Sequence, residues 1–204
     1  ITYVQGFNGL TDKLIDQLKT LNIPLIEDVC ESHGATHNGR KLGSIGLISN
    51  FSFYYAHHMS TIEGGMVSTN DENYYQILRM LRSHGMVREA TNDELKNDFL
   101  KNSNELNPDF IFAYRGFNVR NTEIGAVLGR TQLKRLDRNI ELRTKNLLTF
   151  LECLDPEKFR TDFLTKGSSN YALNIVMKDK DFDMRDRIET LLSDNEIEFR
   201  RGSA

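Results

Sequence analysis

Short apolar runs alternate with segments of helical spacing in the first part of the chain. Four apolar side chains are spaced to share one helix face: Leu10, Leu14, Ile15 and Leu18. Four apolar runs have the length of strands: 1–4, 24–26, 48–55 and 66–69. A second helix is expected from Glu72 to about Ser83, with Asp71 as its N-cap. This alternation predicts an α/β fold.

The pattern changes in the second part of the chain. Residues 88–108 are polar and rich in asparagine, which predicts a long loop. Thr122 is expected to cap a long helix that ends near residue 154. Further on, the pattern predicts strands at 171–177 and 197–199 and a helix over 182–194. We therefore expect one domain over 1–155 and part of a smaller α+β domain over 156–204.

Charge and composition narrow the range of partners. The net charge is −3, which argues against nucleic acid and anionic membranes as partners. No apolar run approaches 18 residues, so we expect no membrane span. Cys30 and Cys153 are too few and too far apart for a disulfide framework, so we expect a cytoplasmic protein. The chain begins at Ile1 rather than Met, and we expect it to be an internal piece of a longer protein.

Two motifs carry a family resemblance. Glu27-Asp28 is followed by Gly34, and a run from Ser52 to His57 is followed by Gly64-Gly65. These resemble E-D-x-x-x-x-x-G and S-F-x-x-x-K of the sugar-nucleotide aminotransferases, the DegT/DnrJ/EryC1/StrS family of fold-type-I pyridoxal phosphate (PLP) enzymes. The resemblance implies the large domain of such an enzyme, a mainly parallel sheet with helices on both faces, and the start of a small C-terminal domain.

The acidic motif supplies two candidate cofactor ligands. Asp28 closes a short apolar strand, where a carboxylate faces the ligand crevice of an open α/β sheet. The resemblance implies that Asp28 keeps the pyridine nitrogen of the cofactor protonated; a strand-end turn residue is the alternative. Glu31 stands where most of these aminotransferases have glutamine, near the 3-oxygen of the cofactor. A solvated glutamate at a helix start is its alternative role.

The second motif places a histidine where the family has its Schiff-base lysine. His57 cannot form a stable imine but can move protons, and no lysine occurs between Lys41 and Lys96. The resemblance therefore implies non-covalent binding of PLP or its amine form, pyridoxamine phosphate (PMP), with Ser52 on its phosphate. His58 follows His57, and on an extended segment the two would point to opposite sides. Ordinary structural roles for the serine and histidines are the alternative.

The octapeptide from Gly116 to Glu123 resembles the family pattern G-x-N-x-R-x-[ST]-E. In that pattern the asparagine, here Asn118, reaches the cofactor phosphate of a neighbouring subunit. The resemblance thus implies a homodimer. His33 and His37 are four residues apart, which on a helix would suit a metal. Because Gly34 and its glycine-rich surroundings argue against a helix, we expect no metal site.

A subgroup of the family with histidine in the lysine position removes the 3-hydroxyl of nucleotide-linked 4-keto-6-deoxy sugars. One type in this subgroup carries an iron–sulfur cluster on four cysteines, and the chain has only two. The resemblance therefore favours the cluster-free type, which acts on GDP-4-keto-6-deoxymannose and uses glutamate as amino donor, in deoxysugar synthesis for O-antigen and other surface lipopolysaccharide. An ordinary sugar-nucleotide aminotransferase, or a non-catalytic relative that only binds cofactor or a partner, are the alternatives.

Overall fold

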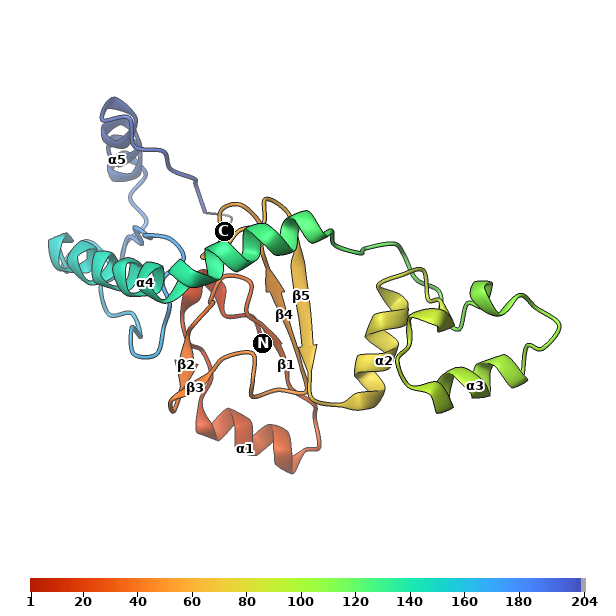
Figure 1. Ribbon diagram of the computed structural model, residues 1–204. Helices are drawn as coiled ribbons and strands as arrows, with labels where there is room; N and C mark the ends of the chain where they lie inside the picture. Colours follow the sequence, from red (N-terminus) through yellow and green to blue (C-terminus); the bar gives the residue numbers. More distant parts are fainter. Residues whose placement is uncertain (203–204) are drawn as a thin grey trace. The chain divides into compact units, whose positions relative to one another are not determined.

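The computed structural model describes residues 1–202. Three strands form a sheet with strand order β1-β4-β5: β1 is Ile26–Asp28, β4 is Ile48–Ser52 and β5 is Gly65–Thr69 (Figure 1). β1 and β4 are parallel, with Asp28 opposite Asn50, and Thr2 adds a parallel bridge to Asp28. β5 returns antiparallel to β4. The β4–β5 connection has no crossover helix, so it favours antiparallel pairing.

The remaining elements follow in order along the chain. They are η1 (Val4–Gly6), α1 (Asp12–Thr20), β2 (Thr36–His37), β3 (Arg40–Lys41), α2 (Glu72–Leu81), η2 (Val87–Glu89), α3 (Asp93–Lys101), η3 (Pro108–Phe110), α4 (Glu123–Cys153) and α5 (Phe182–Asp194). The predicted caps are confirmed. The Asp71 carboxylate accepts from the Tyr74 N–H, and the Thr122 hydroxyl accepts from the Gly125 N–H at 3.4 Å.

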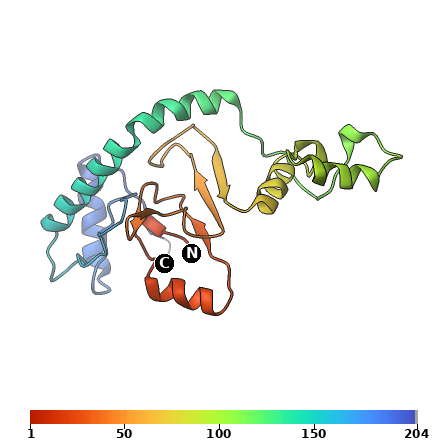
Figure 2. The ribbon, with the colours of Figure 1, turned by 60° about the horizontal axis from the view of Figure 1, so that its bottom comes forward.

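The hydrophobic core packs α1 against the sheet and the turns that follow it (Figure 2). Its buried members are Tyr3, Leu10, Val29, Ala35 and Leu42. Leu14 and Ile15 of the predicted helix face pack against them, as does Phe51 of β4. All of these residues come from the first quarter of the chain.

Four predicted elements are corrected. The loop over 88–108 contains α3, because Asn92 caps a helix by accepting the Leu95 N–H at 2.9 Å. The strands expected at 1–4, 171–177 and 197–199 do not form among the described residues. Thr2 and Met177 each make only an isolated bridge. The Tyr171 N–H bonds to the Gln5 carbonyl at 3.1 Å instead of joining a ladder.

The chain divides into two compact units. The first comprises residues 1–147 and 164–172, and the second comprises 148–163 and 173–204. In the first, residues 164–172 return to contact segments more than 100 positions earlier, for example through Ser169 N–H to the Gly6 carbonyl at 2.9 Å. In the second, Phe159 and Met177 form an isolated antiparallel β-bridge, and Met177 lies shortly before α5 in the sequence. The boundary expected at residue 155 stays a prediction. No helix within residues 1–202 combines the length and apolarity needed to cross a bilayer.

Candidate functional site

The candidate site is built on the ends of two neighbouring parallel strands. Asp28 is the last residue of β1, and Ser52 is the last residue of β4. In the β1–β4 register Asp28 lies opposite Asn50, so Ser52 extends two residues beyond it. The carboxyl ends of parallel strands form the usual ligand crevice of an α/β sheet, and this sheet brings both candidates to the same edge.

The Asp28 carboxylate is held by hydrogen bonds from its own turn and from β4. Its Oδ1 accepts from the Cys30 N–H at 3.2 Å and from the Asn50 amide at 2.9 Å. Partial burial acts to raise the pKa of Asp28, but hydrogen bonds from Cys30, Asn50 and Thr2 outweigh it and hold the pKa below its usual value. Asp28 is therefore a carboxylate anion at neutral pH, as a partner for a protonated ring nitrogen must be.

The two glutamates beside Asp28 have different environments. Glu31 is half-buried, and its Oε2 accepts the Gln5 N–H at 2.7 Å. Glu27 is completely buried. Its carboxylate accepts four hydrogen bonds: from Tyr3 Oη at 2.9 Å, from the N–H groups of Gly43 and Ile45 at 2.8 Å each, and from the Gly46 N–H at 2.5 Å. Glu27 thus ties β1 to the turn before β4, an architectural role that the sequence analysis did not identify.

Ser52 lies where β4 leaves the sheet. Its hydroxyl oxygen accepts the Tyr54 N–H at 3.3 Å, so the hydroxyl proton is left to donate elsewhere. The chain returns to β5 at Gly64, whose carbonyl accepts the Phe53 N–H at 2.9 Å. Gly64 has φ of +147°, and a Cβ there would meet Thr61 Oγ1 and Asn121 Nδ2 at less than 3 Å. This connection therefore requires a glycine at Gly64.

His57 and His58 lie in a turn, and this corrects the expectation of an extended segment. The His57 N–H bonds to the Tyr54 carbonyl at 3.0 Å. Both rings therefore approach the same neighbours. The ring centre of His33 lies 6.3 Å from that of His57 and 5.6 Å from that of His58, and the corresponding distances from Tyr171 are 5.2 and 6.3 Å. We call His33, His57, His58 and Tyr171 the histidine cluster.

Residues 169–171 hold the cluster together. His58 Nε2 lies 3.0 Å from the Asn170 carbonyl oxygen and 3.1 Å from Ser169 Oγ. The Ser169 hydroxyl donates to the His33 carbonyl at 2.7 Å, and Arg143 of α4 donates to the Tyr171 carbonyl at 2.7 Å. His58 therefore has a structural role in positioning. The Nδ1 atoms of His57 and His58 and the Nε2 atom of His33 are buried and have no hydrogen-bond partner within residues 1–202.

Burial determines the charge of the two inner histidines. Burial lowers the pKa of His33 to about 4, and the nearby His57 ring contributes to this shift. Burial also lowers the pKa of His58 to about 4, with further contributions from the positive charge of Arg143 and from His33. Both rings are neutral at pH 7. Neither His33 nor His58 therefore places a positive charge beside His57 at pH 7.

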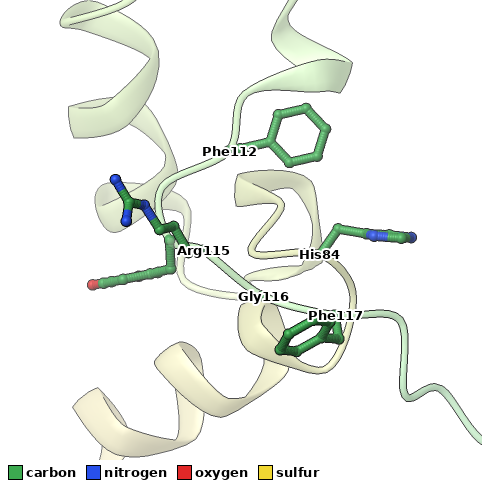
Figure 3. Close-up of a pocket in the computed structure, with 6 residues that line it drawn as sticks. His84, Phe112, Arg115, Gly116 and Phe117 are labelled. Atoms are coloured by element: carbon green, nitrogen blue, oxygen red, sulfur yellow. The ribbon is translucent and has the colours of Figure 1, made fainter.

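Asn118 lies in a separate exposed segment. Its Oδ1 accepts from Arg120 N–H and Nε at 3.3 and 3.1 Å, and its backbone forms a bridge with Ser83. A hollow precedes it, lined by His84, Phe112, Tyr114, Arg115, Gly116 and Phe117. Figure 3 shows the Arg115 and Phe112 side chains extending in opposite directions from this segment. Placement of Asn118 beside a cofactor of a second subunit stays a prediction.

His33 and His37 have different surroundings. His33 is in the histidine cluster, whereas His37 Nε2 lies 2.7 Å from Asp12 Oδ1. Among the described residues there is no grouping of three or more His, Cys, Asp and Glu side chains suited to a metal ion. The sequence analysis missed Asn50, Ser169 and Tyr171. Asn50 belongs to neither family motif, and Ser169 and Tyr171 are more than 110 positions from His57. No local signal therefore identified any of the three.

The chain matches known proteins over most of its length. Residues 11–201 match the DegT/DnrJ/EryC1/StrS aminotransferase family. The chain is 41% identical over 131 residues to a GDP-4-keto-6-deoxy-D-mannose 3-dehydratase of Escherichia coli O55:H7, covering 64% of this chain and 34% of that protein. It is 33% identical over 132 residues to a UDP-4-amino-4,6-dideoxy-N-acetyl-beta-L-altrosamine transaminase of Campylobacter jejuni, covering 65% and 31% of the two chains.

A solved structure agrees with the fold. The E. coli GDP-4-keto-6-deoxy-D-mannose-3-dehydratase with bound hydrated PLP superposes with a TM-score of 0.81 at 32% identity, over 97% of this chain and 51% of that one. The predicted fold class, an α/β fold of the fold-type-I PLP enzymes, is thereby confirmed. The chain spans about a third of the curated E. coli relative and about half of the solved chain. The chain belongs to the DegT/DnrJ/EryC1/StrS aminotransferase family.

Proposed function

We propose that the protein containing this chain is a PLP- or PMP-dependent 3-dehydratase of a nucleotide-linked 4-keto-6-deoxy sugar. The observation that carries the proposal is His57 itself. It occupies the lysine position of the family motif, and no lysine lies between Lys41 and Lys96 to replace that amine. The higher identity to the E. coli dehydratase than to the transaminase supports the same reading.

The residues at the strand ends suit a non-covalently bound cofactor. Asp28, held as an anion by its hydrogen bonds, would pair with the protonated pyridine nitrogen. Ser52, whose hydroxyl proton is not used by Tyr54, would donate to the phosphate. Glu31 would lie near the 3-oxygen, and Asn118 of a second subunit would complete the phosphate site. When bound, the cofactor supplies an amine for the sugar ketone and an electron sink.

His57 is the group that moves protons. Its imidazole would accept a proton at a ring nitrogen and return one to the departing 3-hydroxyl of the sugar, which needs no change in net charge over the cycle. The centres of the Tyr171 ring and the neutral His33 ring lie 5.2 and 6.3 Å from the centre of this imidazole. Glutamate would regenerate the amine form of the cofactor, and the enzyme would act as a cytoplasmic homodimer in deoxysugar synthesis for O-antigen or lipopolysaccharide.

The assay uses the complete protein with PMP, glutamate and GDP-4-keto-6-deoxymannose. We expect replacement of the 3-hydroxyl by hydrogen, detected by mass spectrometry as loss of one oxygen atom from the sugar nucleotide, with the two electrons supplied by glutamate through the amine form of the cofactor and the amine released as ammonia. The His57→Asn variant should bind PMP but leave the 3-hydroxyl on the sugar nucleotide. Formation of an amino sugar without loss of the hydroxyl would instead support a transaminase, as in the C. jejuni relative.

Cofactor attachment gives an independent test. Borohydride reduction of the PLP complex should leave no cofactor on the peptide from Ser52 to Gly65, because this peptide has no lysine. Attachment to a lysine elsewhere would overturn the assignment of His57. Absence of any PLP or PMP binding in the complete protein would support the third reading, a relative that only binds a partner.

A further inference from the structure

We infer that Asn50 is a positioning residue for Asp28, which orients its carboxylate toward the cofactor crevice and keeps it ionised. The inference rests on the proposed function in one respect: it takes from it that the Asp28 carboxylate binds the cofactor. The contact between the Asn50 amide and the Asp28 carboxylate is independent of that proposal.

The Asn50 amide joins two groups of the acidic motif. Its Nδ2 lies 2.9 Å from Asp28 Oδ1 and 3.2 Å from Cys30 Sγ. An amide nitrogen has two protons, so one can point at each acceptor. The side chain is half-buried and comes from the neighbouring strand, directly opposite Asp28 in the register. The amide therefore holds the carboxylate from β4, and the turn containing Cys30 holds it from β1.

The chemistry of this position favours an amide. A carboxylate at residue 50 would place a second negative charge beside Asp28, and one of the two would be protonated. An apolar residue would leave the Oδ1 atom with one fewer donor in a partly buried place. The other ionisable groups of the surroundings are Cys30 and Glu31. Burial raises the pKa of the Cys30 thiol to about 11, with Asp28 contributing, so this neighbour is uncharged.

Asn50 is matched by a control in the same strand. Ser49 is the preceding residue and is buried, and its hydroxyl donates to the Gly43 carbonyl at 2.7 Å. Successive residues of a strand point to opposite faces, so Ser49→Ala removes a buried hydrogen bond of β4 without touching Asp28. Comparison of the two positions separates a role in positioning from a general loss of stability.

The first experiment needs no cofactor. In the complete apoprotein labelled with carbon-13 at the aspartate carboxyl groups, infrared titration identifies Asp28 as the band that Asp28→Asn removes. Asn50→Asp and Asn50→Ala should each raise the pH at which this band titrates, the former by about one unit or more. Ser49→Ala should leave it unchanged. An unchanged Asp28 titration in both folded Asn50 variants, or an equal shift in Ser49→Ala, would overturn the inference.

The second experiment uses PMP labelled with nitrogen-15 in its ring. The nitrogen chemical shift reports ring protonation, and the dissociation constant reports affinity. Asn50→Ala should weaken PMP binding about tenfold, because the Asp28 carboxylate is no longer held toward the ring nitrogen by the amide, whereas Ser49→Ala should change neither affinity nor ring protonation. Failure of wild-type protein to bind PMP would refute the proposed function and leave the infrared result standing. Normal affinity for PMP in folded Asn50→Ala would refute the inference alone.

Discussion

His58 Nε2 lies 3.0 Å from the backbone oxygen of Asn170. Two positions 112 residues apart are thus in contact next to His57, the candidate catalytic residue. The contact is buried, since His58 is 3% exposed and Asn170 5% exposed. It makes the turn that carries His57 dependent on a segment from beyond the long helix α4. The orientation of His57 is thus a property of the whole first unit and not of its motif.

Ser169→Ala should destabilise the first unit by about 1–3 kcal/mol, because it removes the donor to the His33 carbonyl and the partner of His58 from a fully buried position. The measurement is urea unfolding at pH 7. Ser44→Ala is the control, since the Ser44 hydroxyl bonds to the Lys41 carbonyl at an exposed site and its loss should cost about 0.5 kcal/mol or less. Equal effects of the two substitutions would contradict the structural role of Ser169.

Stability should fall as the pH is lowered from about 6.5 to 4. His33 and His58 have folded-state pKa values of about 4, below the usual value near 6.5. In this window the unfolded chain binds more protons than the folded chain, so the free energy of unfolding rises with pH. The contribution of the two histidines reaches its full value above pH 6.5. Each ring can contribute about 3 kcal/mol at pH 4 relative to neutral pH. Measured unfolding free energies should have a shallower slope in His58→Asn; an unchanged slope would refute the assignment.

Glu27→Gln should cost about 3–5 kcal/mol although it changes a single atom. The buried carboxylate accepts four hydrogen bonds, whereas a glutamine must turn two of its own protons toward these donors. Thermal and urea unfolding would measure the loss. Glu63→Gln is the control in an exposed position and should be nearly neutral. A mild effect at Glu27 would mean that the turn over Gly43–Gly46 does not depend on this side chain.

Asp28→Asn and His57→Asn should have different effects in the complete protein. The first removes the charge that would face the pyridine nitrogen, and loss of a charged partner costs about 2–5 kcal/mol, so cofactor affinity or turnover should fall tens- to thousands-fold. The second should leave cofactor affinity almost intact and reduce the rate about 10²–10⁴-fold, the usual contribution of a general acid–base group. Kd and kcat measurements separate the two. Equal and mild effects would show that neither residue faces the cofactor.

Features that depend on neighbours in sequence were predictable. The helix over 182–194 and the caps at Asp71 and Thr122 agree with the structure, because capping and helical periodicity act within a few residues. The family motif around Ser52 and the missing lysine at position 57 are likewise readable from the sequence. The loop expected at 88–108 was wrong because Asn92 caps a helix, a use of asparagine that its composition alone does not distinguish.

Tertiary structure alone decided which side chains meet at the site. The strands expected at 171–177 and 197–199 do not form among the described residues, since a strand needs a partner that its own sequence does not specify. The β1–β4 register brought Asn50 to Asp28, and the return of residues 164–172 brought Ser169 and Tyr171 to the histidines. The sequence by itself determined the family, the helices at 72–81 and 182–194 and the place of His57 in the Ser52 motif. Contacts between segments more than 100 positions apart determined what surrounds His57, because burial and hydrogen-bond partners arise only when distant segments meet.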